Sequence, residues 1–528
     1  MPKSNVINRA KVYQYFDKTA WPNLKTYFGR VVKGQPLVYD TPFAKGESTK
    51  AMLDAWDKEL VSISDKWPSL YEFEMDLASK VGPLSVMKPL SERIDDVLAY
   101  YEGILLPSEP LNRSAVLAVV KEWSPARGLW MRSVPKTVER MKLSTNSGSP
   151  YFTKRRNVKS SASDLTVRGK YSLTDGYINT AVLGWRGQEG GYSKEDVKQR
   201  VVWMFPFSVN VAELEVYQPL IEAAQRFDIV PAWVSMDNVD KRVTQLFDTK
   251  SEHDLVICTD FTKFDQHFNH HMAEAAKAII KAVFNNSIDW WLSEVYNIKY
   301  TIPLMINYGL VAQGNHGMGS GSGGTNADET LAHRALQYEA AITAGKRLNL
   351  NSMCLGDDGI LTYPGCTVKD VVDVYSKHGL EMNTSKQYAS TQDCVYLRRW
   401  HHKDYRINGL CAGVYSTMRA LGRLRYLERY QDPQWWGPKA VALRQLSILE
   451  NVKYHPLRDQ FAEFCMKRDK YRLGVDIPGF LNNLEAEVKE SIDHMPDFLG
   501  YTKTLQSEGD PTYGINSWWI VNYLKSKA

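Results

Sequence analysis

Short apolar runs that end on aspartates constrain the fold of this chain more than any other feature of its sequence. Residues 255–259 are apolar and β-branched and lead directly into Asp260. Residues 352–355 and 359–363 have a similar character and are joined at Gly356-Asp357-Asp358. Such runs predict buried strands, and the glycine and aspartates between the last two predict a hairpin turn. If the strands are neighbours in one sheet, their carboxylates converge at its end.

Converging carboxylates would make a site for divalent cations. Hard oxygen ligands suit Mg²⁺ or Mn²⁺, which keep several waters and bind substrate phosphates. Two such ions can stabilise the attacking and the leaving oxygen of a phosphoryl transfer. We expect Asp260 and Asp357 to be direct metal ligands, with Asp358 as a supporting carboxylate of the same metal site. The alternative is ordinary turn chemistry, since Asp-Asp-Gly is common at hairpins.

The elements around these runs predict a mixed α/β chain without repeats. A glycine-rich run at 314–324 cannot be a regular element, because glycine carries too much backbone entropy. A strand or strand pair is predicted over residues 197–207. Helices are predicted from spacing and composition over 211–225, 273–283, 325–340, 367–378, from 419 onward, and after Pro438.

Positive charge is concentrated in two segments. The net charge is only +5 over 528 residues, but residues 132–170 carry ten Lys or Arg against two acidic residues. Residues 386–429 carry nine against three. Clustered positive charge is typical of a polyanion-binding surface, and the alternative is a solvated face. Residues 144–170, rich in Ser, Gly and basic residues, are predicted to form an exposed loop.

Several classes of protein are disfavoured. With 44% hydrophobic and 24% charged residues, the composition is that of a globular chain and not of a disordered one. The six cysteines are spaced singly, which gives little support to a zinc site. No apolar stretch approaches the ~20 residues that cross a bilayer, and the first residues do not have a secretory pattern. We therefore expect a soluble protein in a reduced compartment, with no membrane partner.

The motifs together resemble those of the viral RNA-dependent RNA polymerases, most closely those of double-stranded RNA viruses of the picobirnavirus and partitivirus kind. Asp260 and Asp265, with four residues between them, are similar to the first palm motif. Ser320-Gly321 with Thr325 resembles the second, and Gly356-Asp357-Asp358 the third. The order of the three motifs also matches, and the resemblance covers roughly residues 145–400.

Four flanking motifs resemble the family more weakly. Lys386 lies where the family has a lysine that could protonate the leaving pyrophosphate as a general acid. Lys198 and Arg200 resemble the basic motif that contacts the incoming triphosphate. The remaining two are predicted RNA contacts, namely Ser147, Gly148 and Pro150 with the template and Arg398 and Arg399 with the nascent 3′ end. For the basic residues, a solvated strand face or surface is the alternative.

The predicted sugar site departs from the family at one position. The family often has Asn four residues after the threonine of the second motif, whereas this chain has Glu329 there and Asn326 beside Thr325. Gly321 and Asn326 remain candidates for nucleotide binding, but we assign recognition of the ribose mainly to Asp265, Ser320 and Thr325. The 2′-hydroxyl distinguishes RNA from DNA. The alternative for Asp265 is a cap of the helix that follows it.

The resemblance implies a right-hand polymerase with fingers, palm and thumb, closed by an N-terminal extension. The implied boundaries are 1–100 for the extension that bridges fingers and thumb, 101–206 and 270–310 for the fingers, 207–269 and 311–404 for the palm, and 405–528 for the thumb and tail. The implied partners are an RNA template and product, nucleoside triphosphates and a viral capsid protein. The implied locations are the virion interior and the host cytoplasm.

Initiation without a primer is also expected, and a polymerase that starts in this way needs an aromatic surface on which the first nucleotide can stack. The candidates for this surface are Trp435-Trp436, Trp518-Trp519 and Tyr513, with core packing as the alternative. Three rival functions remain. They are a reverse transcriptase, a non-enzymatic RNA-binding or capsid-associated protein, and a metal-dependent nuclease.

Overall fold

The chain folds into helices and short strands in mixed order, as the sequence predicts. The computed structural model describes residues 1–528 except 1–4, 162–166, 169–171, 174–177, 492–493 and 495–513. The strands are β1 (Ile7–Arg9), β2 (Val167–Arg168), β3 (Ser172–Leu173), β4 (Ala181–Gln188), β5 (Lys198–Met204), β6 (Val256–Thr259), β7 (Leu304–Asn307), β8 (Leu310–Ala312), β9 (Met353–Leu355), β10 (Asp358–Leu361), β11 (Tyr388–Ser390), β12 (Asp393–Tyr396), β13 (Arg399–His402) and β14 (Val414–Tyr415).

The α-helices form a run before β2, are mixed with the strands up to β14, and dominate the rest of the chain. They are α1 (Trp21–Lys33), α2 (Thr49–Leu60), α3 (Pro68–Ala78), α4 (Leu90–Glu102), α5 (Arg113–Glu122), α6 (Val134–Arg140), α7 (Phe207–Arg226), α8 (Pro231–Val234), α9 (Met236–Thr249), α10 (Phe264–His267), α11 (His270–Val283), α12 (Asp289–Glu294), α13 (Ile298–Thr301), α14 (Thr325–Thr343), α15 (Val368–Ser376), α16 (Thr417–Arg425), α17 (Pro438–Glu450), α18 (Arg458–Arg468), α19 (Leu484–Ser491) and α20 (Trp519–Lys525).

The predicted aspartate-terminated strands pair in one sheet. β11, β6, β10 and β9 lie side by side in that order, and each neighbouring pair is antiparallel. All four residues of β6 are buried, as expected of a strand read from a continuous apolar run. The predicted hairpin is confirmed, because β9 and β10 pair directly on either side of the Gly-Asp-Asp segment.

A second sheet carries the predicted basic strand. Its order is β1-β8-β7-β4-β5, and β4 pairs with β5 over seven residue pairs in antiparallel register. β5 confirms the strand predicted within residues 197–207, and α7 begins three residues after it. The residues on β5 alternate in burial, so that Lys198 and Arg200 lie on its exposed face.

The helices predicted near the aspartates are also confirmed, and polar caps explain where two of them start. The Asn269 side chain accepts hydrogen bonds from the first amides of α11, and the Thr367 hydroxyl caps α15. The alternative interpretation of Asp265 as the cap of α11 is therefore wrong. The glycine-rich run at 314–324 forms no helix or strand, and α14 follows it directly.

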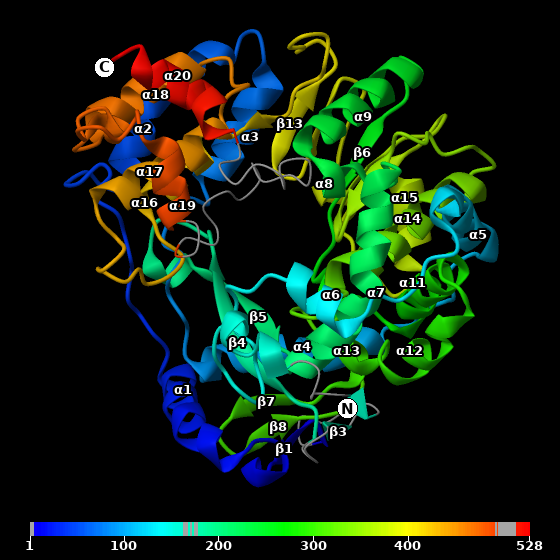
Figure 1. The fold of residues 1–528 in the computed structure, drawn as a ribbon. Helices are drawn as coiled ribbons and strands as arrows, with labels where there is room; N and C mark the ends of the chain where they lie inside the picture. The colour runs from blue at the N-terminus through cyan, green and yellow to red at the C-terminus, as the bar shows by residue number, and fades with distance from the viewer. Residues whose placement is uncertain (1–4, 162–166, 169–171, 174–177, 492–493, 495–513) are drawn as a thin grey trace.

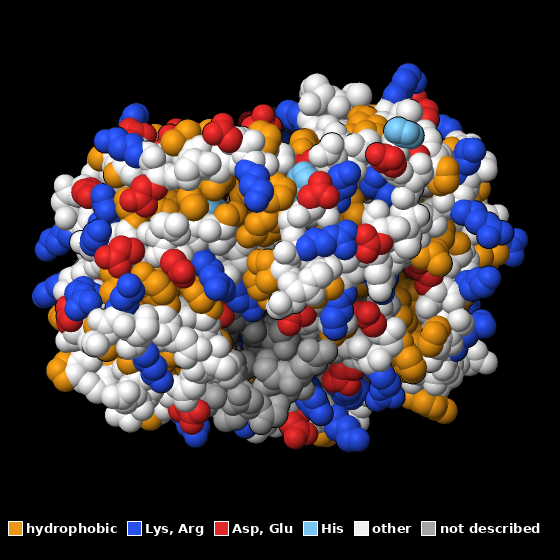
Figure 2. Space-filling view, turned by 90° about the horizontal axis from the view of Figure 1, so that it is seen from above, with side chains coloured by type: hydrophobic (Ala, Val, Ile, Leu, Met, Phe, Trp, Pro, Cys, Tyr) orange, Lys and Arg blue, Asp and Glu red, His pale blue; other side chains and the backbone are white. Residues whose placement is uncertain are grey.

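Figure 1 shows the elements arranged in a ring. α16–α20 lie with α2 and α3 at the upper left, β6, α9, α14 and α15 at the right, and the five-stranded sheet at the bottom. The surface seen from above in Figure 2 has Lys, Arg, Asp and Glu side chains interspersed among apolar ones. Within the described residues, no helix is long and apolar enough to cross a membrane.

The first hundred residues contribute to both large hydrophobic cores. Phe16 and Phe28 pack in the core that contains the five-stranded sheet, α11 and α14. Phe43, Trp56 and Leu70 pack in the core formed by α16–α20. These residues thus connect the two cores, while the predicted bridging of fingers and thumb and the boundaries of the lobes stay predictions.

A buried ion pair anchors α14 where it meets α13 and α7. Lys299 Nζ on α13 lies 3.0 Å from Asp328 Oδ2 on α14, and both side chains are fully buried. The hydroxyls of Tyr217 and Tyr300 donate to the same carboxylate at 2.7 and 2.6 Å. Burying a charge is costly unless it is paired and hydrogen-bonded, and here both conditions are met.

We predict that Asp328→Asn lowers the free energy of unfolding by about 3 kcal/mol or more, because it leaves Lys299 without its buried counter-charge. Urea denaturation followed by circular dichroism measures the loss. Lys369→Ala is the control, since the Lys369–Asp373 pair on α15 is exposed (80% and 54%) and should contribute nothing measurable. Equal losses in the two variants would contradict the prediction.

Candidate active site

The pairing of β6 with β10 brings the predicted aspartates to one end of the sheet. Gly359 lies opposite Thr259 in the antiparallel register. One residue further along each strand, the same register places Asp358 beside Asp260, with Asp357 at the adjoining turn. The convergence predicted from the sequence therefore follows from the register of two neighbouring strands.

Asp260 and Asp357 form a negatively charged pair at the end of this sheet. Both side chains are exposed, yet the surrounding protein desolvates them and raises the pKa of each. The charges of Asp265 and Asp260 raise the pKa of Asp357 further, whereas Arg200 opposes this effect. Lys386, exposed in the turn before β11, lowers the pKa of Asp260. Arg200 and Lys386 thus lie within electrostatic range of the carboxylates, and the roles predicted for them stay predictions.

Asp358 is turned toward the β12–β13 turn. Its Oδ2 accepts a hydrogen bond from the Leu397 amide at 2.7 Å, and burial raises its pKa to about 7. Arg398, at the same turn, is exposed. Arg399 is buried and donates to the Asn451 side chain at 3.1 Å. Of the two predicted RNA contacts in this turn, therefore, only Arg398 faces solvent beside the carboxylates.

Two glycines shape the turn that carries Asp357. Gly356 has φ +58°, a left-handed conformation that favours glycine. Its amide donates to Thr330 Oγ1 at 2.9 Å, and its carbonyl accepts from His333 Nδ1 at 2.8 Å. A Cβ at Gly359 would lie 2.6 Å from the His333 ring. Burial lowers the pKa of His333 to about 4, so the ring is neutral and packs closely beneath the hairpin.

The glycine-rich run lies between the two sheets. The Met318 amide donates to the Asp265 carbonyl at 2.8 Å, and the Trp203 amide on β5 donates to the Ser320 carbonyl at 2.7 Å. Gly321 also packs on Trp203, because a Cβ there would lie 2.0 Å from the Trp203 carbonyl oxygen. The predicted residues Asp265, Ser320 and Gly321 are thus brought together with the strand that carries Arg200.

The position of the family's asparagine is occupied by a buried acid. The Glu329 carboxyl faces Asp265, and burial together with the Asp265 charge raises its pKa well above the ordinary value. Asn326 is exposed, and its Oδ1 accepts from Trp233 Nε1 at 2.8 Å. The Thr325 hydroxyl donates to the backbone of the glycine-rich run at 3.2 Å. Glu329, and not Asn326, therefore lies beside the predicted ribose-binding aspartate.

Glu213 is a site residue that the sequence did not reveal. It is fully buried on α7, and it accepts hydrogen bonds from the Ser322 hydroxyl and, at 3.1 Å, from the Gly323 amide. Burial raises the pKa of Glu213 to about 7, although the charge of Lys299 opposes the shift. The carboxyl and the loop it holds are 110 residues apart in the chain, so no local pattern links them.

The predicted template loop is packed and not exposed over its first residues, so the expectation of an exposed loop is wrong there. Ser147 and Ser149 are each 2% exposed. The Ser147 amide donates to the Thr153 carbonyl at 2.7 Å, and the Phe207 amide at the start of α7 donates to the Ser149 carbonyl at 2.9 Å. Gly148 is buried and Pro150 half-buried. The segment is therefore held against the end of β5.

Among the residues that the structure describes, no three His, Cys, Asp or Glu side chains form a group that could hold a metal ion. The exposed carboxylates of Asp260 and Asp357 make up a two-residue set. Mg²⁺ is typically bound through one or two carboxylates together with waters and substrate phosphates. The two carboxylates therefore fit a cation whose remaining ligands come from water and the substrate.

We predict that Glu213→Gln changes the pH dependence of stability. The pKa of Glu213 is higher in the folded chain (about 7) than its ordinary value of 4.5, so its contribution to stability is lost as the pH rises between those values. The free energy of unfolding of the variant, relative to wild type, should rise by about 3 kcal/mol from pH 4.5 to pH 7.5. Urea denaturation at both pH values measures this, and a constant difference would contradict the prediction.

Comparison with known proteins accords with this geometry. The family model described as viral RNA-dependent RNA polymerase matches residues 85–409. The chain is 57% identical over 518 residues to a potential RNA-dependent RNA polymerase of Human picobirnavirus (strain Human/Thailand/Hy005102/-), covering 96% of this chain and 97% of that one. Crystal structures of the RNA-dependent RNA polymerase of a human picobirnavirus and of its insertion loop deletion mutant match with TM-scores of 0.93 and 0.91. They are 54% and 53% identical, and each match covers 99% of this chain and 100% of the other. The chain therefore belongs to the viral RNA-dependent RNA polymerase family and has its right-hand polymerase fold.

Proposed function

We propose that this polymerase joins ribonucleotides on an RNA template with two divalent metal ions held by Asp260 and Asp357, and that it starts RNA without a primer. The observation that carries the proposal is the convergence of the two exposed carboxylates at the end of β6 and the β9–β10 turn. Their raised pKa values support a cation site, because desolvation and mutual repulsion penalise carboxylates that lack counter-charge.

Mg²⁺ or Mn²⁺ bound at these carboxylates would favour ionisation of the attacking 3′-hydroxyl and neutralise charge on the leaving pyrophosphate. In this proposal Asp358 is a supporting carboxylate, since its Oδ2 already accepts from the Leu397 amide. Arg200 and Lys198, on the exposed face of β5, neutralise triphosphate charge. Lys386, exposed beside Asp260, donates a proton to the leaving pyrophosphate.

In this proposal the ribose of the incoming nucleotide is recognised by Asp265 together with the glycine-rich run. Asp265 lies next to Glu329, whose neutral carboxyl can donate a hydrogen bond to it. Ser320 lies within the run and Thr325 directly follows it, and both are bonded to the backbone there or beside it. A site built to bond a hydroxyl rejects a substrate that lacks one, because its own polar groups are then left without partners. This arrangement favours ribonucleotides and argues against a reverse transcriptase.

RNA contacts are proposed at two places. Residues 147–150 guide the template against the end of β5, and Arg398 contacts the nascent strand beside Asp358. Arg399 is proposed to act indirectly, since it is buried against Asn451. The proposed setting is the virion interior and the host cytoplasm, with a viral capsid protein as a further partner, and family membership supports it.

Initiation without a primer requires a stacking surface, and the candidates differ in exposure. Trp518 is buried and Trp436 and Trp519 pack against the core of α16–α20, so core packing accounts for these three. Trp435 is 49% exposed, and its ring stacks on His494 with a centroid distance of 3.6 Å. Trp435 is therefore the proposed platform residue. Tyr513 lies outside the described residues.

We predict that Asp260→Asn and Asp357→Asn each reduce metal-dependent incorporation of labelled ribonucleotides by about a thousandfold or more, because each removes a charge that holds the cations. The assay uses a single-stranded RNA template with Mg²⁺ or Mn²⁺, with and without a primer. Asp373→Asn is the control, since Asp373 is an exposed acid on α15.

Four outcomes of that assay separate the proposal from its rivals. Incorporation by wild type without a primer, lost in both variants, supports the metal site and unprimed initiation together. Incorporation only with a primer would remove unprimed initiation and leave the metal site. No incorporation by wild type under either condition would favour a non-enzymatic RNA-binding protein, and degradation of the template without triphosphates would favour a nuclease.

We predict that Asp265→Ala lowers the preference for ribonucleotides over deoxyribonucleotides at least about tenfold, because the partner of the 2′-hydroxyl is lost. The ratio of kcat/KM for the two substrates with the same base measures the preference. An equal loss of kcat/KM for both substrates, with an unchanged ratio, would assign Asp265 to folding of the site and not to sugar recognition.

A further inference from the structure

One face of α14 is polar and bonds the backbone of the β9–β10 hairpin along its length. Thr330 and His333 hold Gly356 at the tip, as described above. Arg334 Nη1 donates to the Ser352 carbonyl at 2.6 Å, at the start of β9. Gln337 Nε2 donates to the Met353 and Ile360 carbonyls at 2.9 and 3.2 Å, on both strands. The spacing of three, four and seven residues places these side chains on one helix face.

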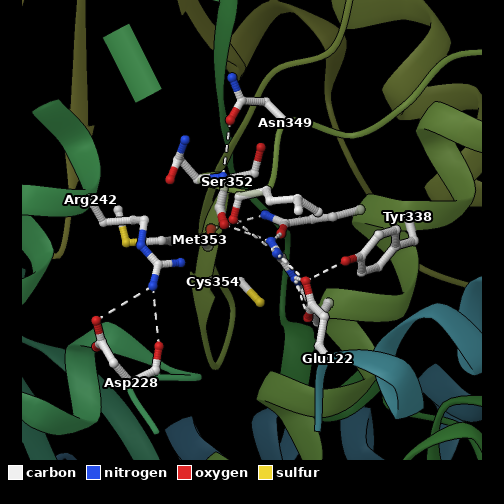
Figure 3. Close-up of polar contacts among 12 residues, drawn as sticks. Glu122, Asp228, Arg242, Tyr338, Asn349, Ser352, Met353 and Cys354 are labelled. Carbon is white, nitrogen blue, oxygen red and sulfur yellow. Dashed lines mark hydrogen bonds and ion pairs between the residues drawn. The ribbon is translucent and has the colours of Figure 1, made fainter. Parts of the chain in front are cut away.

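Arg334 is itself fixed by an acid from the N-terminal part of the chain. Its Nε donates to both oxygens of Glu122, at the end of α5, at 3.2 and 3.0 Å, and its Nη2 donates to Glu122 Oε1 at 2.6 Å. The Tyr338 hydroxyl donates to the same carboxylate. Figure 3 shows Glu122 and Tyr338 on one side of the cluster and Ser352 of the hairpin on the other.

The guanidinium geometry explains why arginine is suited to this position. One edge of the Arg334 guanidinium binds Glu122. Its Nη1 donates to the Ser352 carbonyl and also, at 2.9 Å, to Gln337 Oε1. The side chains of Arg334 and Glu122 are only 12% and 21% exposed, so the ion pair is largely shielded from solvent. A planar fork with fixed donors can serve both partners at once, whereas a lysine ammonium acts as a compact point charge.

We propose that Arg334, locked by Glu122, is a positioning residue that sets the placement of the Gly-Asp-Asp turn and thereby of the Asp357 carboxylate relative to Asp260. It acts through the backbone at Ser352, four residues before Gly356, and touches no substrate. The role assigned to Asp357 rests on the proposed function. The link from Glu122 to the hairpin rests only on the contacts above.

A matched arginine lies on the other side of the same hairpin. Arg242 on α9 lines the small cavity that Arg334, Met353 and Cys354 also line, and Figure 3 shows it directed toward Asp228. Arg242 Nη2 donates to the Asp228 carbonyl at 3.1 Å and lies 3.5 Å from its carboxylate. Arg242→Gln therefore removes an arginine ion pair next to the hairpin without removing a bond to Ser352.

The test compares Arg334→Gln, Arg334→Lys and Glu122→Gln with Arg242→Gln in the full chain. The first readout is hydrogen–deuterium exchange of residues 352–361 without metal or nucleotide. The second readout is the affinity for Mn²⁺, measured by electron paramagnetic resonance in the absence of RNA. We expect faster exchange and at least about tenfold weaker Mn²⁺ binding in the first three variants, as for other outer partners of metal ligands, and neither change in Arg242→Gln. Arg334→Lys keeps a positive charge opposite Glu122, and it carries the test if Arg334→Gln does not fold.

The kinetic readout separates positioning from general stability. In the variants that remain folded, kcat should fall at least about tenfold while KM for the nucleotide changes little, because the metal-holding turn and not the nucleotide pocket is displaced. Exchange and Mn²⁺ binding equal to wild type in folded Arg334 variants would overturn the inference. Failure of wild type to bind Mn²⁺ both with and without a nucleoside triphosphate would overturn the proposed metal site, and with it the inference about Asp357.

Discussion

The antiparallel pairing of β6 with β10 is the constraint on which the rest of the site depends. Side chains alternate across a sheet with a period of two, so a slip of one residue would turn Asp260 or Asp358 to the opposite face. The register observed here, with Gly359 opposite Thr259, brings the carboxylates together at one end. All four residues of β6 are buried, and the strand lies inside the sheet with β10 on one side and β11 on the other.

α14 supports the β9–β10 hairpin of this sheet through polar contacts, while its apolar residues, among them Leu331 and Leu336, pack in the large core. Its buried polar residues include Asp328, Glu329, Thr330, His333, Gln337 and Glu339. In the first turn of the helix, Asp328 bonds to Lys299 and to two tyrosines. Further along, Thr330 and Gln337 bond to the backbone of the hairpin. Hydrogen bonds have narrower geometric limits than apolar contacts. A polar helix face therefore holds the hairpin in one position, where an apolar face would permit several.

The parts of the site that could be predicted are those encoded by local patterns. An apolar run ending on Asp260, a turn of Gly356-Asp357-Asp358 and a glycine-rich run before a helix each have a signature within about ten residues, and the structure has all three. Contacts between distant segments could not be predicted. Examples are the Glu213 carboxyl at Ser322 and the packing of residues 147–149 against α7, where a Ser- and Gly-rich composition suggested exposure. The polar face of α14 has helix-forming composition, but its partners are set by tertiary packing alone.

The division of the first hundred residues between two cores has a consequence for how the chain is made. Trp56 Nε1 donates to the Thr417 hydroxyl, 361 residues later in the sequence, and its ring packs on Phe461 and Phe464. At roughly 5–20 residues per second, a ribosome supplies those partners only tens of seconds after Trp56 emerges. Throughout that interval the apolar faces of α2 and α3 have no native cover, and an apolar surface of this kind is what chaperones bind. The same connection that closes the ring in the finished enzyme thus leaves apolar surface of the N-terminal segment without its native partners until the C-terminal helices have been made.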